Sequence, residues 1–235
     1  MGAPQRLHFQ QLFGVARRLG YDVDFQHIAF GSILGEDKKL MRTRSGESIS
    51  LKSLLEEAVS RATAIVAEKN PDLSEEDREA IGAIVGIGAV KYAELSQHRM
   101  SDYIFSWDKM LSLQGNTAPY LQNAYVRCRS IFRKLSGPLT VANSLTLREK
   151  PELDLAKKIL LFPDVVPAIL DGFKPNILAT YLYELAAEFH GFYESCPVLS
   201  AVPPVRETRL MLCDVFSRVL EAGLALLGIQ VPEKM

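Results

Sequence analysis

Residues 86–127 read GIGAVKYAELSQHRMSDYIFSWDKMLSLQGNTAPYLQNAYVR, and this stretch divides the chain into two parts. Its beginning completes a helical pattern whose larger side chains share one face. These residues are Ile81, Ile84, Val85, Ala89 and Tyr92. Residues 101–116 show no sustained period, and Thr117 with Pro119 then favours the start of a new helix. We therefore expect a boundary near residue 115, with one region at 1–115 and a second at 116–235.

Helical spacing dominates on both sides of this boundary, so the sequence predicts a mainly α protein. Before the boundary we expect helices at 9–19, at 51–66 after a cap at Ser50, and from a cap at Ser74 through Tyr92. Beyond it we expect helices at 121–132, 152–161, 165–170, 177–193 and 205–227. Residues 23–33 are the best strand candidate, while residues 35–48 and 136–149 are predicted to be loops.

Composition excludes several classes of protein. Lys and Arg number 27 against 28 Asp and Glu, so a nucleic-acid partner would need a local basic surface. The three cysteines are far apart, which excludes a disulfide framework and fits a reducing compartment. No CxxC pair or spaced Cys/His cluster suggests a metal site. Without a signal-peptide pattern or a long apolar window, the chain is expected to be cytoplasmic and to have no contact with a membrane.

Two segments concentrate positive charge. Residues 38–46 combine four Lys and Arg residues with hydroxyls and a glycine, groups that can contact phosphate oxygens, although a solvated basic loop is the plainer interpretation. Residues 127–158 contain eight Lys and Arg and three Asp and Glu, and eight minus three leaves a local charge of +5. This charge suits a phosphate backbone, and a solvated helix face is an equal alternative.

The remaining histidines and aromatic residues do not specify a reaction. The four histidines have no nucleophile or metal-ligand partner at a recognisable spacing, so each is expected to be structural. The aromatic residues of the 177–193 helix are expected to lie in the core or at its edge rather than to stack on bases. They are Tyr181, Tyr183, Phe189, Phe192 and Tyr193.

Four strings in order resemble arginyl-tRNA synthetases. They are AFGSILGEDKKLMRTRSGESISL at 29–51, the opening stretch at 86–127, LAAEFHGFYESCPVL at 185–199 and GLALLGIQVPEKM at 223–235. The resemblance covers essentially the whole chain. It implies a mainly α fold, in which a helical bundle anticodon-binding domain of the DALR type (116–235) follows an incomplete carboxy-terminal remnant of a Rossmann-type catalytic domain (1–115).

Members of this class I family are arginine–tRNA ligases, which activate arginine with ATP and then transfer the arginyl group to tRNA. The resemblance implies tRNA, arginine and ATP as partners of the full-length enzyme, with Mg accompanying ATP as a substrate complex. It implies no bound metal or prosthetic group, and a monomer.

The resemblance also places candidate catalytic residues. Residues 41–46, which read MRTRSG, occupy the position of the family's KMSKS motif but differ from it in sequence. Cations of this loop would stabilise the negative charge that develops on the pyrophosphate leaving group. These cations are Lys39, Arg42 and Arg44. The ATP contacts of the same loop would be Met41, Thr43, Ser45 and Gly46. Near the amino terminus, Gln5 matches a glutamine near the amino-acid substrate and His8 a histidine near the nucleotide.

Six further residues match, or lie close to, the tRNA-facing region of the family. They are Trp107, Asn116, Gln122, Tyr125, Arg129 and Arg209. Arg129 is expected to contact phosphate rather than to read a base, because that is the commoner role for a basic side chain. For Arg209, contact with RNA and a role in holding helices together are equal alternatives.

The family's HIGH motif does not occur in the chain. Because catalysis needs its donors and cations arranged together, we expect this chain to bind tRNA but not to form arginyl-adenylate alone. The alternatives are a free-standing tRNA-binding module without catalytic activity, and a helical scaffold that binds nothing specific.

Overall fold

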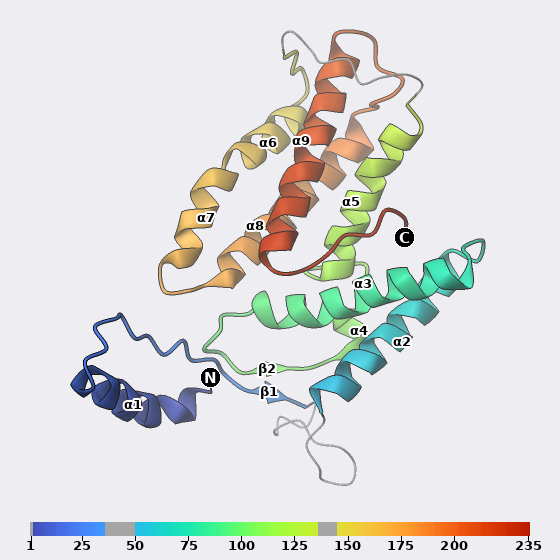
Figure 1. Ribbon diagram of the computed structural model, residues 1–235. Helices are drawn as coiled ribbons and strands as arrows, with labels where there is room; N and C mark the ends of the chain where they lie inside the picture. Colours follow the sequence, from blue (N-terminus) through green and yellow to red (C-terminus); the bar gives the residue numbers. More distant parts are fainter. Residues whose placement is uncertain (1, 36–49, 136–144) are drawn as a thin grey trace.

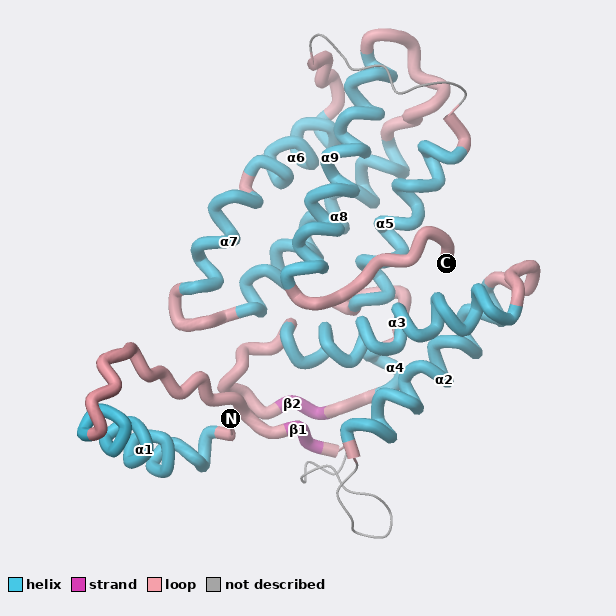
Figure 2. Tube along the Cα trace, viewed as in Figure 1, coloured by secondary structure: helices cyan, strands magenta, loops and turns pink. Residues whose placement is uncertain are grey.

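The computed structural model describes residues 2–35, 50–135 and 145–235, and it is mainly helical as predicted (Figures 1 and 2). A short 3-10 turn, η1 (Ala3–Gln5), leads into α1 (Arg6–Arg18). The next elements are β1 (Ile33–Leu34), α2 (Leu51–Lys69), α3 (Glu75–Leu95), β2 (Tyr103–Ile104) and α4 (Trp107–Met110). The remaining helices are α5 (Ala118–Arg133), α6 (Lys150–Leu160), α7 (Phe162–Leu170), α8 (Pro175–Ser195) and α9 (Val205–Leu226).

Helices α5 to α9 form a bundle in which α8 and α9 run antiparallel (Figure 1). Their apolar faces enclose a core in which the rings of Phe189 and Phe216 stack with centroids 4.0 Å apart. Leu121, Leu155 and Leu182 are fully buried beside them. The helices expected between residues 121 and 227 are therefore confirmed. Each packs apolar residues against this core, although those of α7 are only partly buried.

Helices α2 and α3 form an antiparallel hairpin that crosses beneath the bundle (Figure 1). The predicted caps are confirmed, since the Ser50 and Ser74 hydroxyls accept the backbone N–H of Ser53 and Asp77, each at 3.1 Å. The two helices approach closely at Gly86. A Cβ atom on Gly86 would lie 2.6 Å from the carbonyl oxygen of Ala58, so a larger residue does not fit there.

The strand expected at residues 23–33 is wrong for most of its length. Within the described residues, only Ile33 and Leu34 form a strand, which pairs in parallel with Tyr103 and Ile104. Residues 23–29 belong to neither strand. Their aromatic rings instead pack on α1, where Phe25 stacks on Phe13 at 5.2 Å.

We call residues 2–35 the N-terminal arm. It contains α1 and the chain up to β1, and it extends away from the rest of the molecule (Figures 1 and 2). Ala29 is the one buried residue of the arm, while apolar side chains such as Leu7 and Leu19 are exposed. The parallel β1–β2 pair joins the arm to the chain that follows α3. Among the described residues, no helix is long and apolar enough to cross a membrane.

Candidate nucleic-acid interface

The loop that resembles the family's KMSKS motif lies outside the described residues. This loop contains the candidate catalytic and ATP-contacting residues Lys39, Met41, Arg42, Thr43, Arg44, Ser45 and Gly46. The structure shows the elements that flank it, β1 ending at Leu34 and α2 beginning at Leu51.

The candidate substrate contacts Gln5 and His8 lie in η1 and the first turn of α1. Both side chains are exposed. The His8 ring meets the edge of Phe9, with ring centroids 5.6 Å apart. Gln5 directly precedes α1 and His8 lies in its first turn, so both are at the amino-terminal end of this helix.

Trp107 begins the short helix α4 and is half-buried. Its indole ring meets the edge of Phe105 at 4.8 Å, and the guanidinium of Arg61 lies 5.0 Å from the ring centroid. Both contacts are with other residues of this chain. Trp107 therefore joins α2 to the segment that follows β2.

Two candidate RNA contacts, Asn116 and Gln122, have their side chains bonded within the protein. The hydroxyl of Tyr92 donates to Oδ1 of Asn116 at 2.6 Å and also lies 2.9 Å from the carbonyl oxygen of Ala179. Gln122 is fully buried, and its Nε2 donates to the carbonyl oxygen of Gln230 at 2.8 Å. These bonds join α3 to α8 and to the loop before α5, and they join α5 to the carboxy-terminal tail.

The other three candidates have different surroundings. Tyr125 is buried, and its hydroxyl lies 3.4 Å from a carboxylate oxygen of Glu221. Burial, followed by the negative charge of Glu221, raises the pKa of Tyr125. Arg209 is buried beside Glu152, a geometry that favours holding helices together over contact with RNA. Arg129 is partly exposed, with its guanidinium 5.5 Å from the Phe132 ring centroid.

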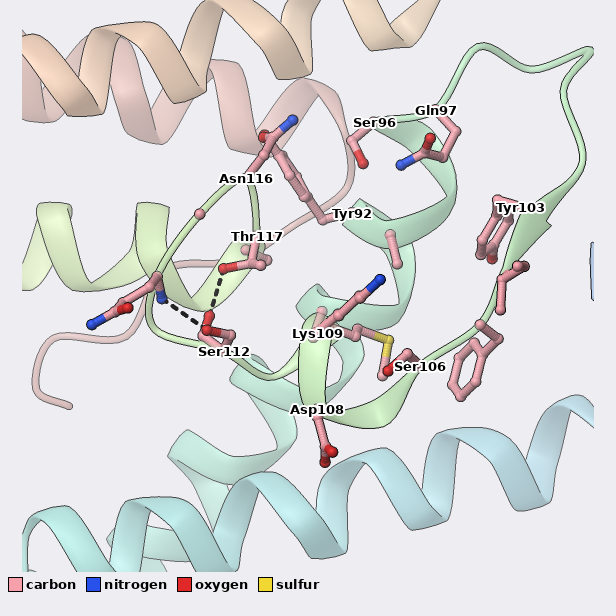
Figure 3. Close-up of a pocket in the computed structure, with 18 residues that line it drawn as sticks. Tyr92, Ser96, Gln97, Tyr103, Ser106, Asp108, Lys109, Ser112, Asn116 and Thr117 are labelled. Carbon is pink, nitrogen blue, oxygen red and sulfur yellow. Dashed lines mark hydrogen bonds between the residues drawn. The ribbon is translucent and has the colours of Figure 1, made fainter. Parts of the chain in front are cut away.

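A cavity of about 520 Å³ lies at the junction of the two parts (Figure 3). The end of α3, β2, α4 and the start of α5 form its walls. Its polar lining includes Tyr92, Gln97, Tyr103, Lys109 and Asn116. Burial, and then the charge of Glu94, raises the pKa of Tyr103 to about 12, so this hydroxyl remains a hydrogen-bond donor at neutral pH.

The loop that borders this cavity has a defined shape. The hydroxyl of Thr117 donates to the carbonyl oxygen of Ser112 at 2.6 Å, and the backbone N–H of Gln114 donates to the Ser112 hydroxyl at 3.1 Å (Figure 3). Thr117 also caps α5 by accepting the backbone N–H of Tyr120 at 3.2 Å. These bonds place Asn116 between the cavity and the first turn of α5.

The structure also brings Arg127, from the basic segment 127–158, together with four rings that the sequence did not single out as RNA contacts. We call them the aromatic face, and they are Tyr120, Arg127, Tyr183, His190 and Tyr193. The ring of Tyr120 lies 5.6 Å from that of Tyr183 and 5.0 Å from that of His190, measured between centroids. The guanidinium of Arg127 lies 5.5 Å from the Tyr193 ring centroid.

The aromatic face is accessible. Its four rings are partly exposed and Arg127 is exposed, whereas Tyr181 and Phe189 of the same helix are buried as expected. Burial, and then the positive charge of Arg127, lowers the pKa of His190, which keeps the imidazole neutral at neutral pH. Tyr120 and Arg127 are seven residues apart, as are Tyr183 and His190, so each pair lies on one side of its helix. This spacing is the feature of the sequence from which the aromatic face could have been predicted.

Comparison with known families accounts for nearly all of the chain. The family model described as "tRNA synthetases class I (R), catalytic domain" matches residues 1–107. The model described as "DALR anticodon binding domain" matches residues 121–235. The α5 cations and, apart from Tyr120, the aromatic face therefore lie within the part that resembles an anticodon-binding domain.

Curated relatives of the chain are arginine–tRNA ligases. The chain is 46% identical to the arginine–tRNA ligase of Cellvibrio japonicus and 48% identical to that of Pseudoalteromonas translucida. Each alignment covers 99% of this chain but 41% of the relative, so the chain spans about two fifths of the length of these proteins.

Solved structures share the fold. The arginyl-tRNA synthetase of Thermus thermophilus matches 88% of this chain and 35% of its own chain, with a TM-score of 0.79 and 34% identity. The enzyme of Plasmodium falciparum matches all of this chain and 40% of its own, with a TM-score of 0.83 and 30% identity. The two matched family models, the sequence identity and the shared fold together show that the chain belongs to the arginyl-tRNA synthetase family.

Proposed function

We propose that this chain supplies the tRNA-holding part of an arginine–tRNA ligase, and that it binds the anticodon stem and loop across α5 and α8. The aromatic face is the observation that carries the proposal. It offers partly exposed rings beside the exposed guanidinium of Arg127. Proteins that bind single-stranded RNA stack unpaired bases on aromatic rings and hold the adjacent phosphates with cations.

The charge on α5 supports phosphate contact. This helix contains three arginines and no Asp or Glu, and Lys134 follows its last residue. Two other cations of the basic segment are neutralised by partners, Lys150 by Asp154 and Lys158 by Glu184. The positive charge of residues 127–158 is therefore concentrated on α5.

Because the relatives are arginine–tRNA ligases, the proposal extends to the reaction of the whole ligase. In that reaction, arginine and ATP with Mg are co-substrates and tRNA accepts the arginyl group. Lys39, Arg42 and Arg44 would meet the charge on pyrophosphate, and Gln5 and His8 would contact arginine and the nucleotide. The fully buried thiols fit a cytoplasmic enzyme, which we propose acts as a monomer.

Binding of tRNA to the chain across a salt series tests the proposal. We expect an affinity that falls steeply as salt rises, because cations release counterions from phosphates. Replacing one phosphate-contacting cation, in Arg127→Gln or Arg129→Gln, should lower the slope of log affinity against log salt by about 1. Lys52→Gln, on the surface of α2, is the matched control and should leave the slope unchanged. Absence of binding at low salt would overturn the proposal.

A further inference from the structure

One side chain, that of Arg99, connects the N-terminal arm to the helical bundle. Arg99 lies in the turn after α3. Its Nη1 donates to the carbonyl oxygen of Ala29, in the arm. Its Nε and Nη2 both donate to the carbonyl oxygen of Gly172, each at 3.2 Å, in the turn between α7 and α8. The guanidinium therefore bonds to two segments that are distant in sequence.

Side-chain packing does not close this junction. The space enclosed by residues 28–33, the end of α3 and the α7–α8 turn is a cavity of about 330 Å³. Phe30 lines it from the arm, and Ile169 and Leu170 line it from α7. Because this space is open, van der Waals contact between the arm and the turn is weak there. The bonds of Arg99 cross this space.

The arm is also attached to the chain around Arg99. The backbone N–H of Gly31 donates to the carbonyl oxygen of Arg99 at 2.7 Å. The backbone N–H of Ser32 donates to Oδ1 of Asp102 at 2.6 Å. These bonds hold the arm to residues 99–102, and the Arg99 side chain extends the connection to Gly172.

The α7–α8 turn has an unusual backbone at the point where Arg99 binds. Gly172 has φ of +75° and Phe173 has φ of +54°. Phe173 is thus a bulky residue in the left-handed region, where such residues are strained. The bond from the backbone N–H of Lys174 to the carbonyl oxygen of Ile169, at 2.9 Å, closes the turn. The turn directs the Gly172 carbonyl toward Arg99.

We infer that Arg99 is a positioning residue that holds the N-terminal arm in one orientation relative to the anticodon-binding bundle. The inference rests on the proposed function, in which the bundle binds the tRNA that accepts the arginyl group, while the arm belongs to the part that resembles a catalytic domain. A guanidinium suits this role because it is planar, always charged and donates in several fixed directions. A lysine ammonium, a point charge, does not reproduce that fork.

Distance measurements between spin labels test the inference. All three native cysteines are buried, so labels attach selectively to two cysteines added at exposed positions, Gln10→Cys in α1 and Glu188→Cys in α8. With Arg99 present we expect one narrow distance distribution. Arg99→Ala and Arg99→Lys should both lose it and give a broad distribution. The control Arg218→Ala, which removes an exposed arginine paired with Asp214 in α9, should keep it.

A narrow distribution that persists in Arg99→Ala would overturn the inference. Thermal unfolding checks that each variant is folded, and if Arg99→Ala does not fold, Arg99→Lys decides the matter. Binding of tRNA to the same variants should be unchanged, because α5 and α8 carry it. If the unaltered chain does not bind tRNA, the proposed function fails, while the distance distributions still decide whether Arg99 sets the orientation of the arm.

Discussion

Arg209 and Glu152 form an ion pair inside the helical bundle, with Nε of the guanidinium 2.6 Å from Oε1 of the carboxylate. Glu152 is 0% exposed, and its Oε2 accepts the backbone N–H groups of Arg148 and Glu149 at 2.5 and 2.9 Å. Nη1 of Arg209 also donates to the carbonyl oxygen of Pro197 at 2.7 Å. The pair joins the start of α6, the connection after α8 and the first turns of α9.

Arg209→Ala should destabilise the fold. The substitution leaves the Glu152 carboxylate buried without its cation, and breaking a buried pair in this way costs roughly 3–5 kcal/mol. Urea unfolding measures the loss. Arg218→Ala on the same helix is the control and should change stability by less than about 1 kcal/mol, since its ion pair is on the surface. If Arg209→Ala keeps full stability but binds tRNA weakly, Arg209 contacts RNA instead.

The same carboxylate predicts a loss of stability in acid. Burial alone would raise the pKa of Glu152, but the hydrogen bonds from the Glu149 and Arg148 backbone and from Arg209 outweigh it and lower the pKa. A carboxyl whose folded pKa is depressed contributes stability above its unfolded pKa, near 4.5, and loses it as pH falls through the folded value.

Urea midpoints measured from neutral pH down through that range should therefore fall. Glu152→Gln should be less stable at neutral pH, and its midpoint should fall less in acid. An acid dependence identical in the two proteins would show that other carboxyls cause the effect.

Gly86→Ala should separate α2 from α3. The new Cβ would lie 2.6 Å from the backbone carbonyl oxygen of Ala58, which cannot rotate away as a side chain could. Overpacking of this kind costs about 1–3 kcal/mol. Gly14→Ala in α1 is the matched control, because no atom lies within 4 Å of its Cβ position. That control should be neutral or stabilising by up to about 1 kcal/mol, since alanine favours helix over glycine.

Tyr193→Ala should weaken tRNA binding. If one base stacks on this ring, its loss costs about 1–3 kcal/mol, which is roughly 5- to 150-fold in affinity. Tyr193→Phe keeps the ring and should bind nearly as well. Tyr103→Phe, away from the aromatic face, is a further control. Equal affinities for Tyr193→Ala and the unaltered chain would exclude this ring as a stacking platform.

The chain alone should show no arginine-dependent pyrophosphate exchange, with or without tRNA. It carries the segment that resembles KMSKS but no HIGH string, so only part of the set of groups that meets ATP is present. Radiolabelled pyrophosphate incorporated into ATP is the measurement, with a full-length arginine–tRNA ligase as the positive control. Exchange above background in a clean preparation would show that a complete site exists in these residues.

Much of the helical structure followed from local sequence. Ser50, Ser74 and Thr117 each bond to a backbone N–H three residues ahead, and such caps are short-range interactions that a sequence displays directly. The resemblance to the synthetase family was likewise contained in contiguous strings. The strand expected at residues 23–33 was wrong because pairing depends on a partner about seventy residues away, at Tyr103 and Ile104.

Sequence alone determined the family, the helical class and most helix positions, because periodicity and capping act within a few residues. Tertiary structure alone decided which polar side chains face inward. Gln122 was expected near RNA, and for Arg209 contact with RNA and a role in holding helices together were equal alternatives. The fold gives each a partner inside the protein, at Gln230 and Glu152. The fold likewise assembled the aromatic face from two helices and brought Arg99 between Ala29 and Gly172. These relationships depend on distances between segments far apart in the chain, which packing sets and local sequence does not record.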